Sequence, residues 1–130
     1  MNKILVAEDD RSVRTVIVLV AQRLGFECVE SDNGLEAITL AEAETPDLAI
    51  IDMHMPGIDG LEVVKALARR SPPIPVIAIS AGTTETTIED YAMLSRRMGA
   101  TIFLRKPFSS SQLGEAIEAS LKSERKPCGS

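Results

Sequence analysis

Several features are scarce in this chain of 130 residues, and each scarcity excludes a class of function. Arg and Lys number 14 against 19 Asp and Glu, which argues against a surface for nucleic acid or anionic lipid. The longest apolar run, Val16–Ala21, is too short to span a bilayer, and Met1–Ile4 leads into a strand pattern without a signal sequence. We therefore expect a cytoplasmic protein with neither a membrane nor a nucleic-acid partner.

Cysteine, histidine and glycine-rich loops are also scarce. Cys28 and Cys128 lack the spacing of metal ligands and fall in an apolar strand pattern and a polar tail, so we expect reduced thiols. His54 is the only histidine. The first strand pattern is followed by Glu8 and Asp9 instead of a Gly-rich phosphate loop, which argues against a nucleotide- or flavin-binding enzyme.

Short apolar runs do recur, and five of them alternate with longer amphipathic segments. Runs that are apolar at nearly every position are typical of strands covered on both faces, and therefore of a parallel sheet. We expect strands at Lys3–Ala7, Glu27–Ser31, Asp47–Ile51, Pro75–Ser80 and Thr101–Leu104. Right-handed crossovers then place helices on both faces of a doubly wound α/β domain, residues 1–123, followed by a polar tail, residues 124–130.

Apolar residues at three- and four-residue spacing predict five helices. The first carries Val13, Val16, Ile17, Val20 and Leu24, with Gly25 as its stop. The others cover about residues 35–41, 61–68, 88–98 and 113–121, and Ser109 with Gln112 resembles a capping box before the last helix.

Polar side chains stand where four of the strand patterns end: Glu8 with Asp9, Asp52, Ser80 and Lys106. In an open parallel sheet the carboxyl ends of the strands form one edge, where ligands bind. If the first and third strands are neighbours, each pair of carboxylates about 4 Å apart costs roughly 4 kcal/mol at an effective dielectric constant near 20. A solvated acidic loop explains either segment by itself, but two converging segments favour a hard cation such as Mg²⁺.

Asp52 is a candidate nucleophile, because a carboxylate can form an aspartyl phosphate. This reaction needs charge neutralisation on the phosphoryl oxygens, which Mg²⁺, the Lys106 ammonium and the Ser80 hydroxyl would supply. Taken separately, Ser80 is explained as a turn residue and Lys106 as a solvated lysine before a proline. Only their combination indicates phosphoryl chemistry.

Four motifs together resemble the receiver domains of response regulators in two-component signalling, the CheY-like family. In order, they are Ile4–Asp10 (ILVAEDD), Asp52–Gly60 (DMHMPGIDG), Ser80-Ala81 and Lys106–Phe108 (KPF). The resemblance runs from Lys3 to about Leu121. It implies the flavodoxin/CheY-like sheet of five parallel strands in the order 2-1-3-4-5, with five helices.

The resemblance also implies a role for each charged residue. Asp52 would accept a phosphoryl group from the phosphohistidine of a sensor histidine kinase or a phosphotransfer protein. Asp9 would bind Mg²⁺ directly and Glu8 mainly through water, and Asp52 and the main-chain carbonyl of His54 would complete the protein ligands. Lys106 would pair with the phosphoryl oxygens.

The remaining implied roles concern the switch. Ser80 would hydrogen-bond the phosphoryl group, and Phe103 would be a switch aromatic, with ordinary core packing as its alternative. The Lys106-Pro107 bond would be cis. Asp10 would start a helix rather than bind metal, and the His54 side chain would tune the phosphoryl lifetime rather than catalyse.

The function expected from this resemblance is a single-domain, Mg²⁺-dependent phosphoacceptor that catalyses only its own phosphorylation and dephosphorylation. It would switch the face formed by the fourth and fifth strands and helices toward an unknown protein target, as a monomer or a weak phosphorylation-dependent dimer. A phosphorylation-independent pseudo-receiver is the alternative. The segment between Ser80 and Lys106 is longer than is usual in the family, and we expect the extra residues at Gly82–Glu89. A phosphoryl relay and a piece of a larger protein both stay open.

Overall fold

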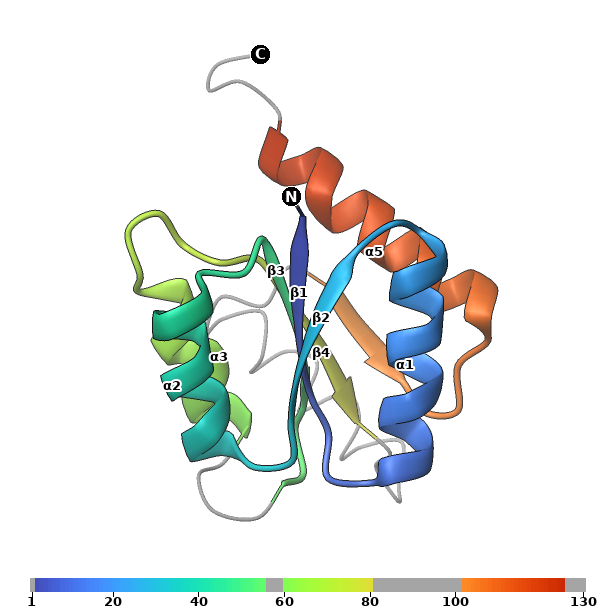
Figure 1. Cartoon of the computed structure of the whole chain (residues 1–130), viewed down its shortest axis with the longest axis horizontal. Helices are drawn as coiled ribbons and strands as arrows, with labels where there is room; N and C mark the ends of the chain where they lie inside the picture. The colour runs from blue at the N-terminus through green and yellow to red at the C-terminus, as the bar shows by residue number, and fades with distance from the viewer. Residues whose placement is uncertain (1, 56–59, 81–101, 126–130) are drawn as a thin grey trace.

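The computed structural model describes residues 2–55, 60–80 and 102–125, and its strands and helices form one layered α/β unit (Figure 1). The elements are β1 (Lys3–Ala7), α1 (Arg11–Arg23), β2 (Glu27–Ser31), α2 (Gly34–Glu44), β3 (Leu48–Asp52), α3 (Gly60–Ala68), β4 (Val76–Ser80), β5 (Ile102–Arg105) and α5 (Ser110–Arg125). The predicted helix at residues 88–98 and the expected insertion at Gly82–Glu89 lie outside the described residues.

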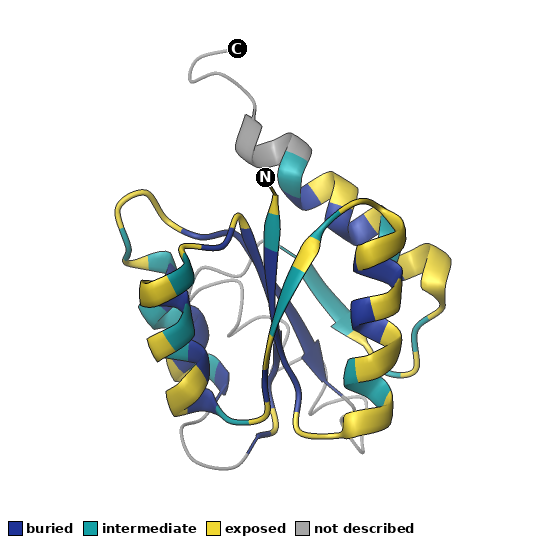
Figure 2. Cartoon of the chain, viewed as in Figure 1, coloured by how far each residue is buried: buried dark blue, intermediate teal, exposed yellow. Residues whose placement is uncertain are grey.

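The five strands form one parallel sheet in the order β2-β1-β3-β4-β5, which confirms the predicted fold. Figure 1 shows α1 and α5 on one side of this sheet and α2 and α3 on the other. Since side chains alternate along a strand, β1 sends Ile4 and Val6 into the cluster beneath α1 and α5, and Leu5 and Ala7 into the cluster beneath α2 and α3. The central strands are consequently buried on both faces (Figure 2).

Helix α1 is where the predicted apolar stripe is partly wrong. Its buried residues are Ile17, Val18, Val20 and Ala21, whereas Val16 is 48% exposed. Leu24 caps the helix and is also exposed. The run of six apolar residues hides the phase of the helix, because a three- and four-residue spacing can be drawn through it in more than one way.

Small shifts at the strand ends matter for the site. Strand β3 begins at Leu48, one residue later than predicted, and Asp47 precedes it with its main-chain N–H donating to the Lys3 carbonyl (2.8 Å) and its carboxylate accepting the Lys3 main-chain N–H (2.8 Å). The strand extends to Asp52, which pairs with Ile79 of β4. Asp52 therefore belongs to the hydrogen-bonded sheet, rather than following it as predicted.

The predicted stops and caps are confirmed where the structure describes them. Gly25 follows α1 with a left-handed φ of 92°, a conformation that favours glycine. Ser109 and Gln112 form a capping box, in which each side chain accepts the main-chain N–H of the other (3.0 and 2.8 Å). Cys28 is a free thiol whose pKa burial raises to about 11. None of the described helices is long and apolar enough to cross a membrane.

Candidate functional site

The carboxyl ends of β1, β3, β4 and β5 bring the predicted site residues together. The order of the strands in the sheet places Glu8 beside Asp52, and Ser80 beside the turn that carries Lys106. Main-chain hydrogen bonds continue past the strand ends, from Met53 N–H to Ile79 (2.8 Å) and from Lys106 N–H to Ser80 (2.9 Å). The site is thus held by the sheet itself.

Three carboxylates converge at this edge. Glu8, Asp9 and Asp52 each offer an oxygen, and these oxygens all lie within 4.8 Å of one another. Glu8 and Asp52 are buried, whereas Asp9 is exposed. The residues brought together are the three acidic side chains that the sequence singled out as metal ligands.

Lys106 is the cation of the site. Its Nζ lies 2.6 Å from Glu8 Oε1 and 3.5 Å from Asp52 Oδ2, and its side chain is 17% exposed. Burial by itself would lower the pKa of Lys106, but the carboxylates of Glu8 and Asp52 outweigh burial and raise it. The ammonium is therefore charged at neutral pH and lies between Glu8 and Asp52.

Glu8 carries the main electrostatic strain of the site. Burial, and then the neighbouring Asp52 carboxyl, raise its pKa to about 7, against the opposing effects of Lys106 and the Asp10 main-chain N–H. Glu8 Oε2 accepts that N–H (3.1 Å), while the fully buried Oε1 lies 2.6 Å from Lys106 Nζ in an ion pair without the geometry of a hydrogen bond. One ammonium does not balance the carboxylates present.

This donor set fits a hard divalent cation. Mg²⁺ prefers oxygen ligands from one or two carboxylates and completes its shell with water and phosphate oxygens. The Oε1 atom of Glu8, a buried acceptor without a directed donor, is the kind of atom that a metal-bound water would satisfy. Glu8, Asp9 and Asp52 are therefore the residues that could hold the ion.

The loop that carries Glu8 and Asp9 is held by residues whose positions the sequence reasoning did not single out. Arg14 on α1 donates from Nη1 to the Glu8 carbonyl (2.8 Å) and from Nε to Glu30 Oε1 (3.1 Å). Ser31 at the end of β2 accepts the Glu8 main-chain N–H at its carbonyl (3.0 Å). The sequence does offer one indication of this role, because Arg14 is a basic residue one turn into a helix that begins beside an acidic loop.

Asp10 caps α1, as predicted. Its Oδ1 accepts the main-chain N–H groups of Ser12 (2.9 Å) and Val13 (3.3 Å). The Ser12 hydroxyl also donates to Oδ1 (2.6 Å). This bond first, and then the two main-chain bonds, lower the pKa of Asp10. The carboxylate next to the cluster is thus engaged at the start of α1.

The segment after β3 packs tightly against the start of α3. The His54 main-chain N–H donates to Asp52 Oδ1 (3.1 Å), which orients the carboxylate. A Cβ on Gly60 would lie 2.5 Å from the Met53 Cα and 2.7 Å from the Asp52 carbonyl oxygen. Only glycine therefore fits at the first residue of α3, which explains the glycine that ends the Asp52–Gly60 motif.

Ser80 and His54 contact each other at the edge of the cluster. Ser80 is fully buried, and its Oγ lies 3.1 Å from Nε2 of the exposed His54 ring. Phe103 stands on β5 opposite Ala78 and packs, half-buried, against the core beneath α2 and α3. The Lys106-Pro107 bond is cis, as the resemblance implied.

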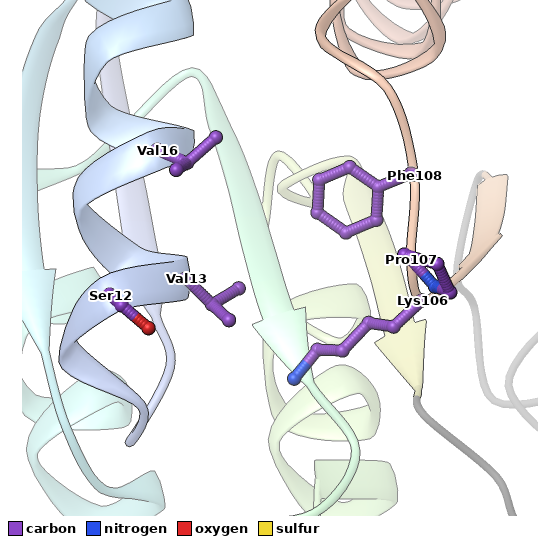
Figure 3. A pocket seen from close by; sticks show the side chains of 6 residues that line it. All are labelled: Ser12, Val13, Val16, Lys106, Pro107 and Phe108. Atoms are coloured by element: carbon purple, nitrogen blue, oxygen red, sulfur yellow. The ribbon is translucent and has the colours of Figure 1, made fainter.

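A hollow of about 550 Å³ opens beside Lys106, between α1 and the turn that leads to α5 (Figure 3). Its lining residues are Ser12, Val13, Val16, Lys106, Pro107 and Phe108. Figure 3 shows Val13 and Val16 facing Phe108 across it, with the Lys106 chain reaching into the site. The exposed Val16 side chain therefore lines a hollow that Lys106 borders, and Lys106 in turn lies 3.5 Å from Asp52.

Comparison with known families matches residues 4–118 to the response regulator receiver domain. The chain belongs to the response regulator receiver domain family. Receiver domains are signalling modules of two-component systems that accept phosphoryl groups from histidine kinases or phosphotransfer proteins. The resemblance stated from the four motifs is thereby confirmed.

Individual relatives agree with this assignment. The receiver domain is 33% identical to the chemotaxis protein CheY of Listeria monocytogenes, over 94% of this chain and 100% of that protein. It is 32% identical to the alkaline phosphatase synthesis transcriptional regulatory protein PhoP of Bacillus subtilis over 93% of this chain, and it spans about half (49%) of PhoP. A Francisella response regulator receiver domain superposes with a TM-score of 0.82 at 27% identity, covering 96% of this chain and 100% of that one.

Proposed function

We propose that this receiver domain is a Mg²⁺-dependent phosphoacceptor whose acceptor is Asp52. One observation carries the proposal: Glu8, Asp9 and Asp52 converge within 4.8 Å while the Lys106 ammonium lies 3.5 Å from Asp52. A surplus of buried carboxylate beside one ammonium is costly unless a ligand uses it. A divalent cation would bind the carboxylates, and a phosphoryl group would pair with the Lys106 ammonium.

The proposed reaction is attack of an Asp52 carboxylate oxygen on the phosphorus of a phosphohistidine. The new P–O bond forms as the P–N bond breaks, and the leaving imidazole keeps the electron pair of the broken bond. The His54 main-chain N–H holds Asp52 Oδ1 in place, and Lys106, opposite Oδ2, meets the charge on the phosphoryl oxygens. Bound Mg²⁺ would neutralise further charge on those oxygens.

The donor would be a histidine kinase or a phosphotransfer protein that covers the hollow next to Lys106. The hollow is apolar on its α1 side, where Val16 is 48% exposed, and Lys106 connects it to Asp52. A partner seated there would exclude water from the reacting atoms and bring its phosphohistidine to Asp52. Ser80 on β4 and Phe103 on β5 would then carry the change to the face formed by the fourth and fifth strands and helices.

The test is the intact mass of the protein after incubation with Mg²⁺ and a small phosphodonor such as acetyl phosphate. We expect the gain of one phosphoryl group, its loss in Asp52→Asn, and its loss when EDTA removes Mg²⁺. Asp47→Asn is the matched control, because Asp47 is an exposed carboxylate at the opposite end of β3. No gain in the wild type, or an undiminished gain in Asp52→Asn, would contradict the proposal and favour a phosphorylation-independent interaction module.

A further inference from the structure

The side chains of His54 and Ser80 contact each other. The proposed phosphoryl transfer uses the main chain of His54 and the hydroxyl of Ser80, but it does not use this contact between the two side chains. Nε2 of His54 and Oγ of Ser80 lie 3.1 Å apart, within hydrogen-bond distance. The main chain of Ser80 is fixed, because Ser80 pairs with Arg105 of β5 and its carbonyl accepts the Lys106 N–H (2.9 Å). The hydroxyl can therefore change direction chiefly by rotating about χ1, between three staggered positions.

We propose that the His54 imidazole is a positioning residue that holds the Ser80 hydroxyl in the unphosphorylated protein and so opposes its move to a phosphoryl group on Asp52. This inference rests on the proposed function. The contact has a consequence in either imidazole tautomer, since the hydroxyl donates to a bare Nε2 or accepts from Nε2–H. In both cases, redirecting the hydroxyl toward Asp52 gives up the contact.

The main chain of His54 adds a second connection to the phosphoacceptor. The His54 N–H donates to Asp52 Oδ1 (3.1 Å), so the residue that holds Ser80 also touches the carboxylate that would be esterified. A phosphoryl group on Asp52 would therefore compete with the His54 imidazole for the Ser80 hydroxyl. Asp52 and His54 belong to the same short segment at the end of β3. His54 would set the balance between the inactive and active positions of Ser80.

The test measures the affinity for beryllofluoride, a phosphoryl mimic, at saturating Mg²⁺ by ¹⁹F NMR titration. His54→Phe keeps a planar ring without a nitrogen, and we expect it to bind beryllofluoride about 3- to 10-fold more tightly, the range for one neutral hydrogen bond. His54→Gln keeps a polar group at a similar reach, so its affinity should stay near that of the wild type. In a Ser80→Ala background, His54→Phe should change nothing.

Each other outcome has a defined meaning. An unchanged or weaker affinity in His54→Phe overturns the inference, and so does an equal gain in the Ser80→Ala background, because the effect would then not pass through the hydroxyl. The Asp52→Asn variant is a control that should bind no beryllofluoride. If the wild-type protein also binds none, the proposed function itself is overturned. Wild-type binding that Asp52→Asn abolishes leaves the proposed function standing, and the His54 variants then decide this inference alone.

Discussion

Two clusters of charge lie at opposite ends of the strands, and each sets one lysine between two carboxylates. At the start of β1, Lys3 Nζ lies 2.8 Å from Glu44 and 3.7 Å from Glu27. At the other edge, Lys106 lies 2.6 Å from Glu8 and 3.5 Å from Asp52. The acidic side chains are 40% and 56% exposed in the first cluster, but 0% and 3% in the second.

Exposure, rather than the pattern of charge, decides what each cluster does. Water screens the cluster around Lys3, and exposed ion pairs contribute little to stability. The hydrogen bond to Glu44 raises the pKa of Lys3, which leaves the charge of this lysine at neutral pH unchanged. At the carboxyl edge, burial instead raises the pKa of Glu8 to about 7, so the same grouping of charges becomes a site that favours a cation or a proton.

The largest expected difference comes from removing each lysine in turn. Lys106→Met leaves Glu8 and Asp52 without their buried cation, and we expect the free energy of unfolding to fall by about 3 to 5 kcal/mol at pH 8 without divalent cations. Lys3→Met removes an exposed cation and should cost much less. Urea denaturation of both variants measures the difference, and similar losses would mean that burial does not distinguish the two ends.

The main chain offers a second comparison, between a glycine at the carboxyl edge and a glycine outside it. Gly60→Ala should lower the free energy of unfolding by about 1 to 3 kcal/mol, because its Cβ would overlap Met53 and the Asp52 carbonyl. Gly114, inside α5, has no atom within 4 Å of an added Cβ, so Gly114→Ala should stabilise the protein by about 1 kcal/mol. Thermal unfolding followed by circular dichroism checks both signs. Destabilisation by neither would contradict the close approach at Gly60, and destabilisation by both would contradict the open space at Gly114.

The two ends should also differ in their response to pH. The pKa of Glu8 is raised from 4.5 to about 7, so its contribution to stability is full below pH 4.5 and is lost as pH rises through 7. Without Mg²⁺, we expect Tm to fall by about 5 °C between pH 5 and pH 8. Glu8→Gln should flatten this fall, whereas Glu44→Gln should leave it unchanged.

Mg²⁺ sharpens the same comparison. A cation binds the deprotonated carboxylates, so the rise in Tm that Mg²⁺ produces should be larger at pH 8 than at pH 6. A rise that is equal at both pH values would show that Glu8 does not titrate in this range. Differential scanning calorimetry with and without Mg²⁺ gives both measurements.

The sequence identifies the members of the site more readily than their mutual contacts. Glu8, Asp52 and Lys106 are marked by their places after apolar runs, and parallel pairing brings such places to one edge. The Lys106–Glu8 ion pair and the His54–Ser80 contact depend on rotamers and on distances between strands, which no residue pattern encodes. The same holds for Val16, whose exposure depends on the phase of α1 within a run of six apolar residues.

The smallest predicted effect concerns Arg14, whose partners no sequence pattern revealed. Arg14 joins the loop of the candidate metal ligands Glu8 and Asp9 to β2, since it donates to both the Glu8 carbonyl and the Glu30 carboxylate. Arg14→Leu should retain the fold and weaken Mg²⁺ binding about 3-fold, because the loop loses a donor that orients it while its carboxylates stay in place. Arg11→Leu, an exposed change at the start of the same helix, is the matched control for charge. If an isothermal titration with Mg²⁺ gave equal losses for both variants, long-range charge would explain the effect; a loss confined to Arg14→Leu would assign it to the hydrogen bond on the Glu8 carbonyl.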